Sequence, residues 1–269
     1  MEEGESYVLH SYIAIGDSFT EGIGDQRPDG SERGWADRVA AGLYQKSLSE
    51  EGTENPPFRY ANLAIRGLKA RPVVDTQLAP AIAQRPDLIS INAGGNNMLR
   101  PRFDPTDTID FLFEAVLRAR DHGSHILLLA GPDPTKNLPF GETISRRGAI
   151  YTEMTYERIE GLEGITFVDN YSDRAFEDTT YWSLDGLHLS PAGHLRVAAN
   201  CLDALGVSYP QEWGDPRSPD ADVKNYRSRA YYAEHIAPWV GRRLRGRSSG
   251  DGRVAKRPFL TDFDPRYDL

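Results

Sequence analysis

The chain has 269 residues, 39% of them hydrophobic, and is long enough to bury one large core or one core with an appendage. Its formal net charge of -9 argues against non-specific binding of nucleic acid or anionic membranes by the body of the protein. The single cysteine, Cys201, excludes an intramolecular disulfide and a thiolate-rich metal site. The acidic N-terminus precedes too short an apolar run for a signal peptide, and no stretch approaches the roughly 18 apolar residues of a membrane span. We therefore expect a cytoplasmic protein without stable membrane insertion.

Short apolar runs and helical periodicities alternate along residues 7–205. The apolar runs predict five strands, at residues 7–15, 58–63, 88–93, 125–130 and 165–168. Apolar residues at helical spacing predict helices at 35–48, 70–84, 106–122, 191–205 and, as one helix or two, 141–162. This alternation predicts a three-layer α/β/α sandwich around a mostly parallel five-stranded sheet.

The composition changes beyond Gly206. Three parts follow: a turn-rich linker at 210–219, an expected helix at 223–245, and a tail at 247–269. Residues 242–257 contain seven basic residues against one acidic residue, a charge run that most simply forms a solvated tail. We expect the tail to be extended or partly disordered and dispensable for folding. The chain is thus divided into an α/β domain over residues 1–206 and a C-terminal extension over 207–269.

The first expected strand ends at Gly16, which delivers Asp17 and Ser18 into a glycine-rich loop. Ligands of open α/β sheets bind just beyond the carboxyl ends of the strands, so Ser18 is placed where chemistry would be done. Taken singly, a serine behind Gly-Asp is most often a helix cap or turn residue. Ser18 becomes a candidate nucleophile only in combination with a base elsewhere in the chain.

Asp185 and His188 supply a carboxylate and an imidazole three residues apart. A serine hydroxyl is a poor nucleophile at neutral pH and needs a base to take its proton, which His188 can do. Asp185 can hold the other ring nitrogen and fix the tautomer. Two other interpretations are a turn with a satisfied histidine, and a metal pair with His194, for which no third ligand lies at a recognised spacing. We expect a serine hydrolase without metal or organic cofactor.

Four motifs occur in a fixed order along the chain. They are Gly-Asp-Ser-Phe at 16–19, Gly67, Gly-Gly-Asn-Asn at 94–97 and Asp-Gly-Leu-His at 185–188. This ordered set resembles the four blocks of the SGNH, or GDSL-type, hydrolase family over residues 7–205, so that 1–206 would be its catalytic domain. The resemblance implies a flavodoxin-like sheet and an esterase or lipase that cleaves a small-molecule carboxylic ester through an acyl-enzyme on Ser18.

The resemblance also implies an oxyanion hole made of the backbone N–H groups of Ser18 and Gly67 and the side-chain amide of Asn96. Glycine at 67 lets the backbone approach a substrate, although such a glycine taken singly is more often a plain turn residue. Asn97 stands where the family usually has aspartate, and we expect it to serve the loop geometry rather than the oxyanion. Two alternatives remain, an acyltransferase that uses the same triad and a non-catalytic ligand-binding protein on the same fold.

Overall fold

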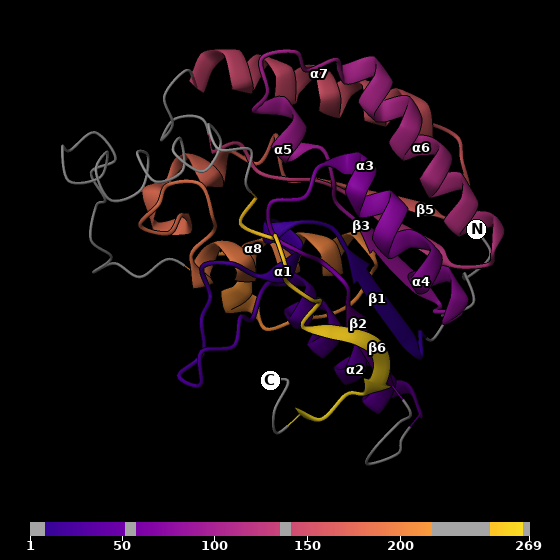
Figure 1. Ribbon diagram of the computed structural model, residues 1–269. Coiled ribbons are helices and arrows are strands. Elements are labelled where there is room, and N and C mark those ends of the chain that lie inside the picture. The colour runs from indigo at the N-terminus through magenta and orange to yellow at the C-terminus, as the bar shows by residue number, and fades with distance from the viewer. Residues whose placement is uncertain (1–8, 52–57, 135–140, 217–247, 266–269) are drawn as a thin grey trace.

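A six-stranded sheet forms the middle layer of the protein (Figure 1). The computed structural model describes residues 9–51, 58–134, 141–216 and 248–265. The strands are β1 (Ser11–Ile15), β2 (Arg59–Asn62), β3 (Leu88–Ile91), β4 (His125–Ala130), β5 (Ile165–Asp169) and β6 (Arg257–Asp262). Their order is β5-β4-β3-β1-β2-β6, and every neighbouring pair is parallel except β2 and β6.

The central strands are buried on both faces, as their continuous apolar runs predict. Every residue of β1 and β3 is buried. In the register of the sheet, Ile13 lies opposite Ala61 of β2 and Ile89 of β3. Because β1, β2 and β3 are parallel neighbours, the loops that follow them emerge at one edge of the sheet. This edge carries the candidate site.

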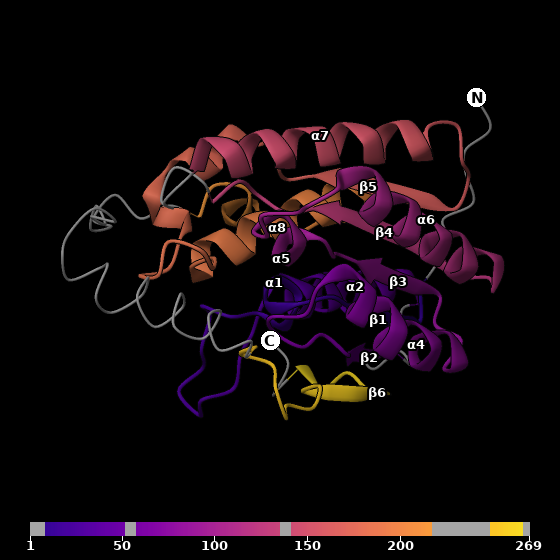
Figure 2. The same ribbon diagram turned by 45° about the horizontal axis from the view of Figure 1, so that its top comes forward.

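Helices cover both faces of the sheet, as Figures 1 and 2 show. The longer helices are α2 (Trp35–Glu51), α6 (Pro105–Asp121), α7 (Gly141–Ile159) and α8 (Pro191–Ala204). One apolar cluster joins Trp35 of α2 and Leu202 of α8 to Tyr12 of β1. A second joins Ile109 of α6 and Tyr151 of α7 to the other face of the sheet. These two clusters confirm the expected three layers.

The helix expected over residues 70–84 is observed over residues 70–83 but changes type twice. It comprises α3 (Ala70–Val73), the π-helical turn η1 (Val74–Leu78) and α4 (Ala79–Ala83). The widened turn comes just before Pro80, which has no N–H to donate within a helix. Gln77, in this turn, points back to the end of β1.

The C-terminal residues correct two expectations. β6 pairs with β2 as a sixth strand at the end of the sheet, where it is yellow in Figure 2. Phe263 follows β6 and is only 4% exposed, with its ring centroid 5.0 Å from Tyr44 and 6.0 Å from Phe58. The count of five strands was therefore wrong, and residues 257–263 of the tail, which was expected to be extended or partly disordered, form a paired strand and a buried contact. An edge strand needs no apolar alternation, so Arg-Pro-Phe-Leu-Thr-Asp gave no strand signal.

Two further expectations are neither confirmed nor contradicted by the described residues. The helix expected over residues 223–245 lies outside the described residues, and the domain division at residue 206 stays a prediction. In the described part of the chain, no helix is both long and apolar enough to cross a membrane.

Candidate active site

Ser18 begins a four-residue helix, α1 (Ser18–Glu21), directly after β1. The carboxylate of Asp17 caps this helix by accepting from the Phe19 N–H at 3.1 Å. Gly16 is packed so closely that an added Cβ would lie 2.8 Å from the carbonyl oxygen of Asn92. The Gly-Asp-Ser sequence therefore makes a sharp turn that leaves Ser18 half-buried.

Gln77 holds the backbone just before this turn, a role that the sequence did not reveal. Its side chain is buried and donates to the Gly16 carbonyl at 2.9 Å, while its oxygen accepts from the Gly16 N–H at 2.8 Å. The N–H and the carbonyl of Gly16 are thus both hydrogen-bonded by the Gln77 side chain. The π-helical turn is the local irregularity that presents Gln77 to Gly16.

Asp185 and His188 form a close pair in one turn. Oδ2 of Asp185 lies 2.5 Å from Nδ1 of His188. The other carboxylate oxygen accepts from Ser183 Oγ at 2.7 Å and from the N–H groups of Leu187 and His188 at 3.0 and 2.9 Å. Burial alone would raise the pKa of Asp185, but the hydrogen bonds and charge of His188 hold that pKa well below its ordinary value. An ionised Asp185 is therefore fixed against the ring, with Nε2 left for other chemistry.

Ser18, Asn96 and His188 line one cavity of about 150 Å³. Within the described residues, the Ser18 hydroxyl makes no hydrogen bond to His188, although both face this space. Large apolar and aromatic side chains form much of the remaining wall: Phe19, Leu99, Ile144, Tyr151, Tyr171 and Trp182. The cavity therefore combines a serine hydroxyl and an imidazole with mostly apolar walls, the usual character of a small-molecule site.

The two asparagines of the third motif have different partners. Nδ2 of Asn96 donates to Oδ2 of Asp17 and to the Leu68 carbonyl, each at 3.0 Å. Oδ1 of Asn97 accepts from the Ala70 N–H at 2.9 Å, at the start of α3. Both lie in the short helix α5 (Gly95–Met98) after β3. Asn96 thus lines the cavity, whereas Asn97 bonds the start of α3.

Gly67 occupies a different position from the other motif residues. Its φ of 78° lies in the left-handed region, which favours glycine. An added Cβ would lie 2.8 Å from the hydroxyl oxygen of Ser249 and would also strike Ser248. Gly67 is not among the residues that line the cavity. The structure therefore brings Ser18, Asn96 and His188 together, with Asp185 behind His188, and places Gly67 beside the C-terminal segment.

Two buried titratable groups lie close to this edge of the sheet. Burial raises the pKa of Asp17 to about 6, against the lowering effect of the hydrogen bonds from Phe19 and Asn96. Burial lowers the pKa of His194 to about 4, and its ring accepts from the Trp35 N–H and bonds the Ile23 carbonyl, each at 3.1 Å. His194 is therefore a buried structural histidine. The described residues contain no group of three or more His, Cys, Asp or Glu side chains arranged to hold a metal ion.

The fold is similar to several solved structures. An acetylxylan esterase from Geobacillus stearothermophilus has 22% identity and a TM-score of 0.57, covering 74% of this chain and 95% of its own. Catalytic mutants of that esterase change a serine, a histidine and an aspartate. The protein TesA has 24% identity and a TM-score of 0.51, covering 72% of this chain and 97% of its own. A lipase from a goat rumen metagenome has 18% identity and a TM-score of 0.57, covering 72% and 96%.

Among curated proteins, none matches the chain. The model of the GDSL-like lipase/acylhydrolase family matches residues 14–196. That range contains Ser18, Asn96 and His188, which line the cavity, and also Gly67 and Asp185. The likeness to esterases and lipases and the parallel α/β/α architecture agree with it. The chain therefore belongs to the GDSL-like lipase/acylhydrolase family.

Proposed function

We propose that the protein is a serine esterase that hydrolyses a carboxylic ester through an acyl-enzyme on Ser18. The observation that carries the proposal is the 2.5 Å contact between Asp185 and His188 at the rim of the cavity that Ser18 also lines. An ionised carboxylate on Nδ1 fixes the tautomer in which Nε2 is the base. An Asp–His pair with a purely structural role would not need a serine at the same cavity, whereas a base and its nucleophile must share one.

In the proposed reaction, Ser18 Oγ attacks the ester carbonyl and His188 Nε2 takes the hydroxyl proton. The resulting imidazolium is stabilised by Asp185 and returns the proton to the alcohol as it leaves. Water then attacks the acyl-enzyme by the same route, releasing the acid and restoring Ser18. In this mechanism the Ser18 hydroxyl swings toward His188 when substrate fills the cavity, since catalytic hydrogen bonds are often formed only in the complex.

The oxyanion is proposed to bind the backbone N–H of Ser18 and the side-chain amide of Asn96, whereas Gly67, expected as a third donor, lies outside the cavity wall beside Ser248 and Ser249. Both hydrogens of Asn96 Nδ2 are engaged, by Asp17 and by the Leu68 carbonyl. An oxyanion carries a full charge and accepts more strongly than a neutral carbonyl, so it can displace the Leu68 bond. The bond to Asp17 then keeps the amide oriented. Each such donor is worth roughly 3 to 4 kcal/mol in the transition state.

The apolar part of the cavity is proposed to hold the acyl group. A volume of about 150 Å³ suits a short chain better than a long one, because each methylene occupies part of a limited space. The name of the structurally similar acetylxylan esterase indicates an acetylated substrate, which supports testing acetyl esters first. A series of p-nitrophenyl esters from acetyl to palmitoyl, run beside acetylated sugars and acyl-CoA, measures this preference. An alcohol acceptor in the same assays distinguishes hydrolysis from acyl transfer.

Labelling with a fluorophosphonate tests the proposal. The intact protein should be modified at Ser18, as located by peptide mass spectrometry, and should lose esterase activity in the same proportion. Ser183, which is hydrogen-bonded to Asp185, provides an internal comparison that should stay unmodified. A protein that binds esters but is never labelled at Ser18 would instead be a non-catalytic binder, and the proposal would be wrong.

A further inference from the structure

The C-terminal segment 248–256 lies against the elements that carry Ser18 and Gly67, although the family match ends at residue 196. Ser248 and Ser249 pack on Gly67, and an added Cβ at Gly250 would lie 3.0 Å from Cγ2 of Ile65 and would strike the Arg66 carbonyl. The segment then reaches β6, which is anchored on β2. It is thus fixed at both ends on the catalytic part of the chain.

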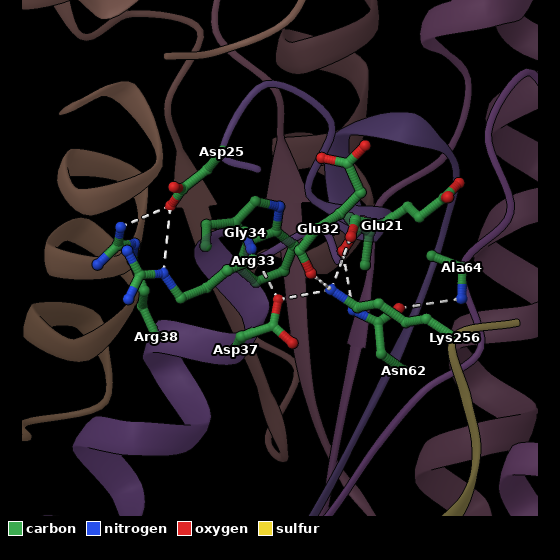
Figure 3. A network of polar contacts seen from close by, with 12 residues as sticks. Glu21, Asp25, Glu32, Arg33, Gly34, Asp37, Arg38, Asn62, Ala64 and Lys256 are labelled. Atoms are coloured by element: carbon green, nitrogen blue, oxygen red, sulfur yellow. Dashed lines mark hydrogen bonds and ion pairs between the residues drawn. The ribbon is translucent and has the colours of Figure 1, made fainter. Parts of the chain in front are cut away.

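Lys256 ends this segment and directs its ammonium group toward Glu21 and Asp37, as Figure 3 shows. Nζ donates to the Glu21 carbonyl at 2.7 Å, the Glu32 carbonyl at 3.0 Å and Oδ2 of Asp37 at 2.7 Å. An ammonium group has three hydrogens, so all of its donors are used. The three acceptors come from the end of α1, the loop between α1 and α2, and the first turn of α2. The side chain is only 23% exposed.

Glu21 is therefore held from two sides. Its carboxylate accepts from the Arg66 N–H at 2.6 Å, from Nε at 2.8 Å and from Nη2 at 2.5 Å, while its carbonyl accepts from Lys256. Arg66 belongs to the loop on which Ser248 and Gly250 pack. The same C-terminal segment thus secures Glu21 directly through Lys256 and lies against the loop that binds its side chain.

The position of Glu21 is coupled to that of Ser18 by short backbone bonds. The Ser18 carbonyl accepts from the N–H groups of Gly22 and Ile23 at 3.2 and 3.1 Å, and Glu21 N–H donates to the Asp17 carbonyl at 2.8 Å. A four-residue helix has no other turns to absorb a displacement at its end. A shift of residues 21–23 must therefore move Ser18, and a misplacement of about 1 Å can cost roughly a hundredfold in rate.

We propose that Lys256 is a positioning residue for Ser18, so that the C-terminal segment is a working part of the active site. The inference rests on the proposed esterase function. An isolated exposed ion pair would contribute little. Lys256 differs because one charged group binds two backbone carbonyls and a carboxylate from three consecutive elements. Lys256 thereby fixes the loop that follows α1, the helix that begins at Ser18.

The test compares Lys256→Met with the wild type in the full chain. Arg253→Met is the matched control, because it removes the same charge from the same segment, and Arg253 is exposed and its side chain, among the described residues, bonds only the Ser249 carbonyl. Fluorophosphonate titration first counts the functional sites, so that kcat refers to folded enzyme only. We expect Lys256→Met to lower kcat per titrated site by roughly tenfold to a hundredfold with KM within about twofold. Arg253→Met should behave as the wild type.

Lys256→Arg gives a second readout that a general loss of stability would not move. Arginine keeps the charge, but its planar guanidinium cannot reach all three acceptors from one nitrogen, so kcat should lie between that of Lys256→Met and that of the wild type. Should Lys256→Met lower only the number of titrated sites and leave kcat per site within twofold, Lys256 would be a stability contact and the inference would be wrong. Failure of the wild type to be labelled at Ser18 would overturn the esterase proposal itself, and the positioning role would fall with it.

Discussion

Nδ2 of Asn96 lies 3.0 Å from Oδ2 of Asp17, the residue that directly precedes Ser18. This bond joins the turn after β1 to the turn after β3 across the floor of the cavity. Asp17 is 5% exposed, and burial raises its pKa to about 6. The same carboxyl caps α1, orients the candidate oxyanion donor and is costly to ionise. Its protonation state therefore affects both the stability and the geometry of the site.

We expect the stability cost of Asp17 to appear between about pH 4 and pH 6. Its folded pKa is above the unfolded value, so the folded state binds the proton more tightly and loses stability as the pH rises through this range. The effect is at most about 3 kcal/mol, from a shift of about two pKa units. Denaturant unfolding of the wild type and Asp17→Asn measures it. The stability of the wild type relative to the variant should fall from pH 4 to pH 7.

For Asp185→Asn we expect the opposite dependence of stability on pH. The pKa of Asp185 is lowered, so its contribution is present above about pH 4 and is lost as the pH falls below that value. An Asp17→Asn variant whose stability relative to the wild type does not change with pH would contradict the assignment of a buried carboxyl with a raised pKa at residue 17.

Asn96 and Asn97 are predicted to respond differently to substitution. Asn96→Ala should lower kcat by roughly 10² to 10³ with a small change in KM, as expected for a donor used in the transition state. Asn97→Asp should keep its activity, because a carboxylate can still accept from the Ala70 N–H and does so more strongly. Steady-state kinetics on the two purified variants decide the assignment. Normal turnover by Asn96→Ala together with an inactive Asn97→Asp would reverse the two roles.

Gln77→Met is predicted to weaken both the fold and the activity. The substitution keeps the length of the side chain but leaves the Gly16 N–H without its partner in a buried place. An unsatisfied buried donor costs about 1 to 3 kcal/mol, which denaturant unfolding can measure. Because Gly16 precedes Asp17 and Ser18, kcat should also fall. Gln211→Met, at an exposed position, is the control and should change neither quantity.

Phe263→Ala tests the packing of the C-terminal residues. Phe263 is buried against Tyr44 and Phe58, so its removal should cost about 3 to 5 kcal/mol of unfolding free energy. Phe259→Ala is the matched control, because Phe259 lies on β6 with 68% of its surface exposed and should change stability by less than about 0.5 kcal/mol. Equal effects of the two substitutions would show that the tail is not packed as described.

The sequence was most informative where the structural signal is local. The strand at His125–Ala130 was predicted with its observed bounds because every residue after His125 is apolar and buried. The Asp185–His188 pair was likewise predictable, since both residues belong to one turn. Asn96 and Asn97 could be told apart only by motif register, and their partners agree with that register.

Features that depend on distant partners were missed. Gln77 contacts Gly16 across 61 residues, and a glutamine inside a helical pattern carries no sign of that partner. β6 joins β2 from the far end of the chain, and its sequence has neither alternation nor an apolar run. Lys256 was counted within a solvated basic run, although its ammonium group has three acceptors. The composition of such a run does not reveal that an individual side chain, here that of Lys256, is bound to the rest of the protein.

The most direct test of the account is kcat for ester hydrolysis in Ser18→Ala, His188→Ala and the double variant. Members of a triad act as a unit, so each single substitution should remove nearly all turnover, by a thousandfold or more, and the double variant should be no worse than either. Circular dichroism should show an unchanged fold in all three. Purified Ser18→Ala that retains most of the wild-type turnover would contradict the assignment of Ser18 as the nucleophile.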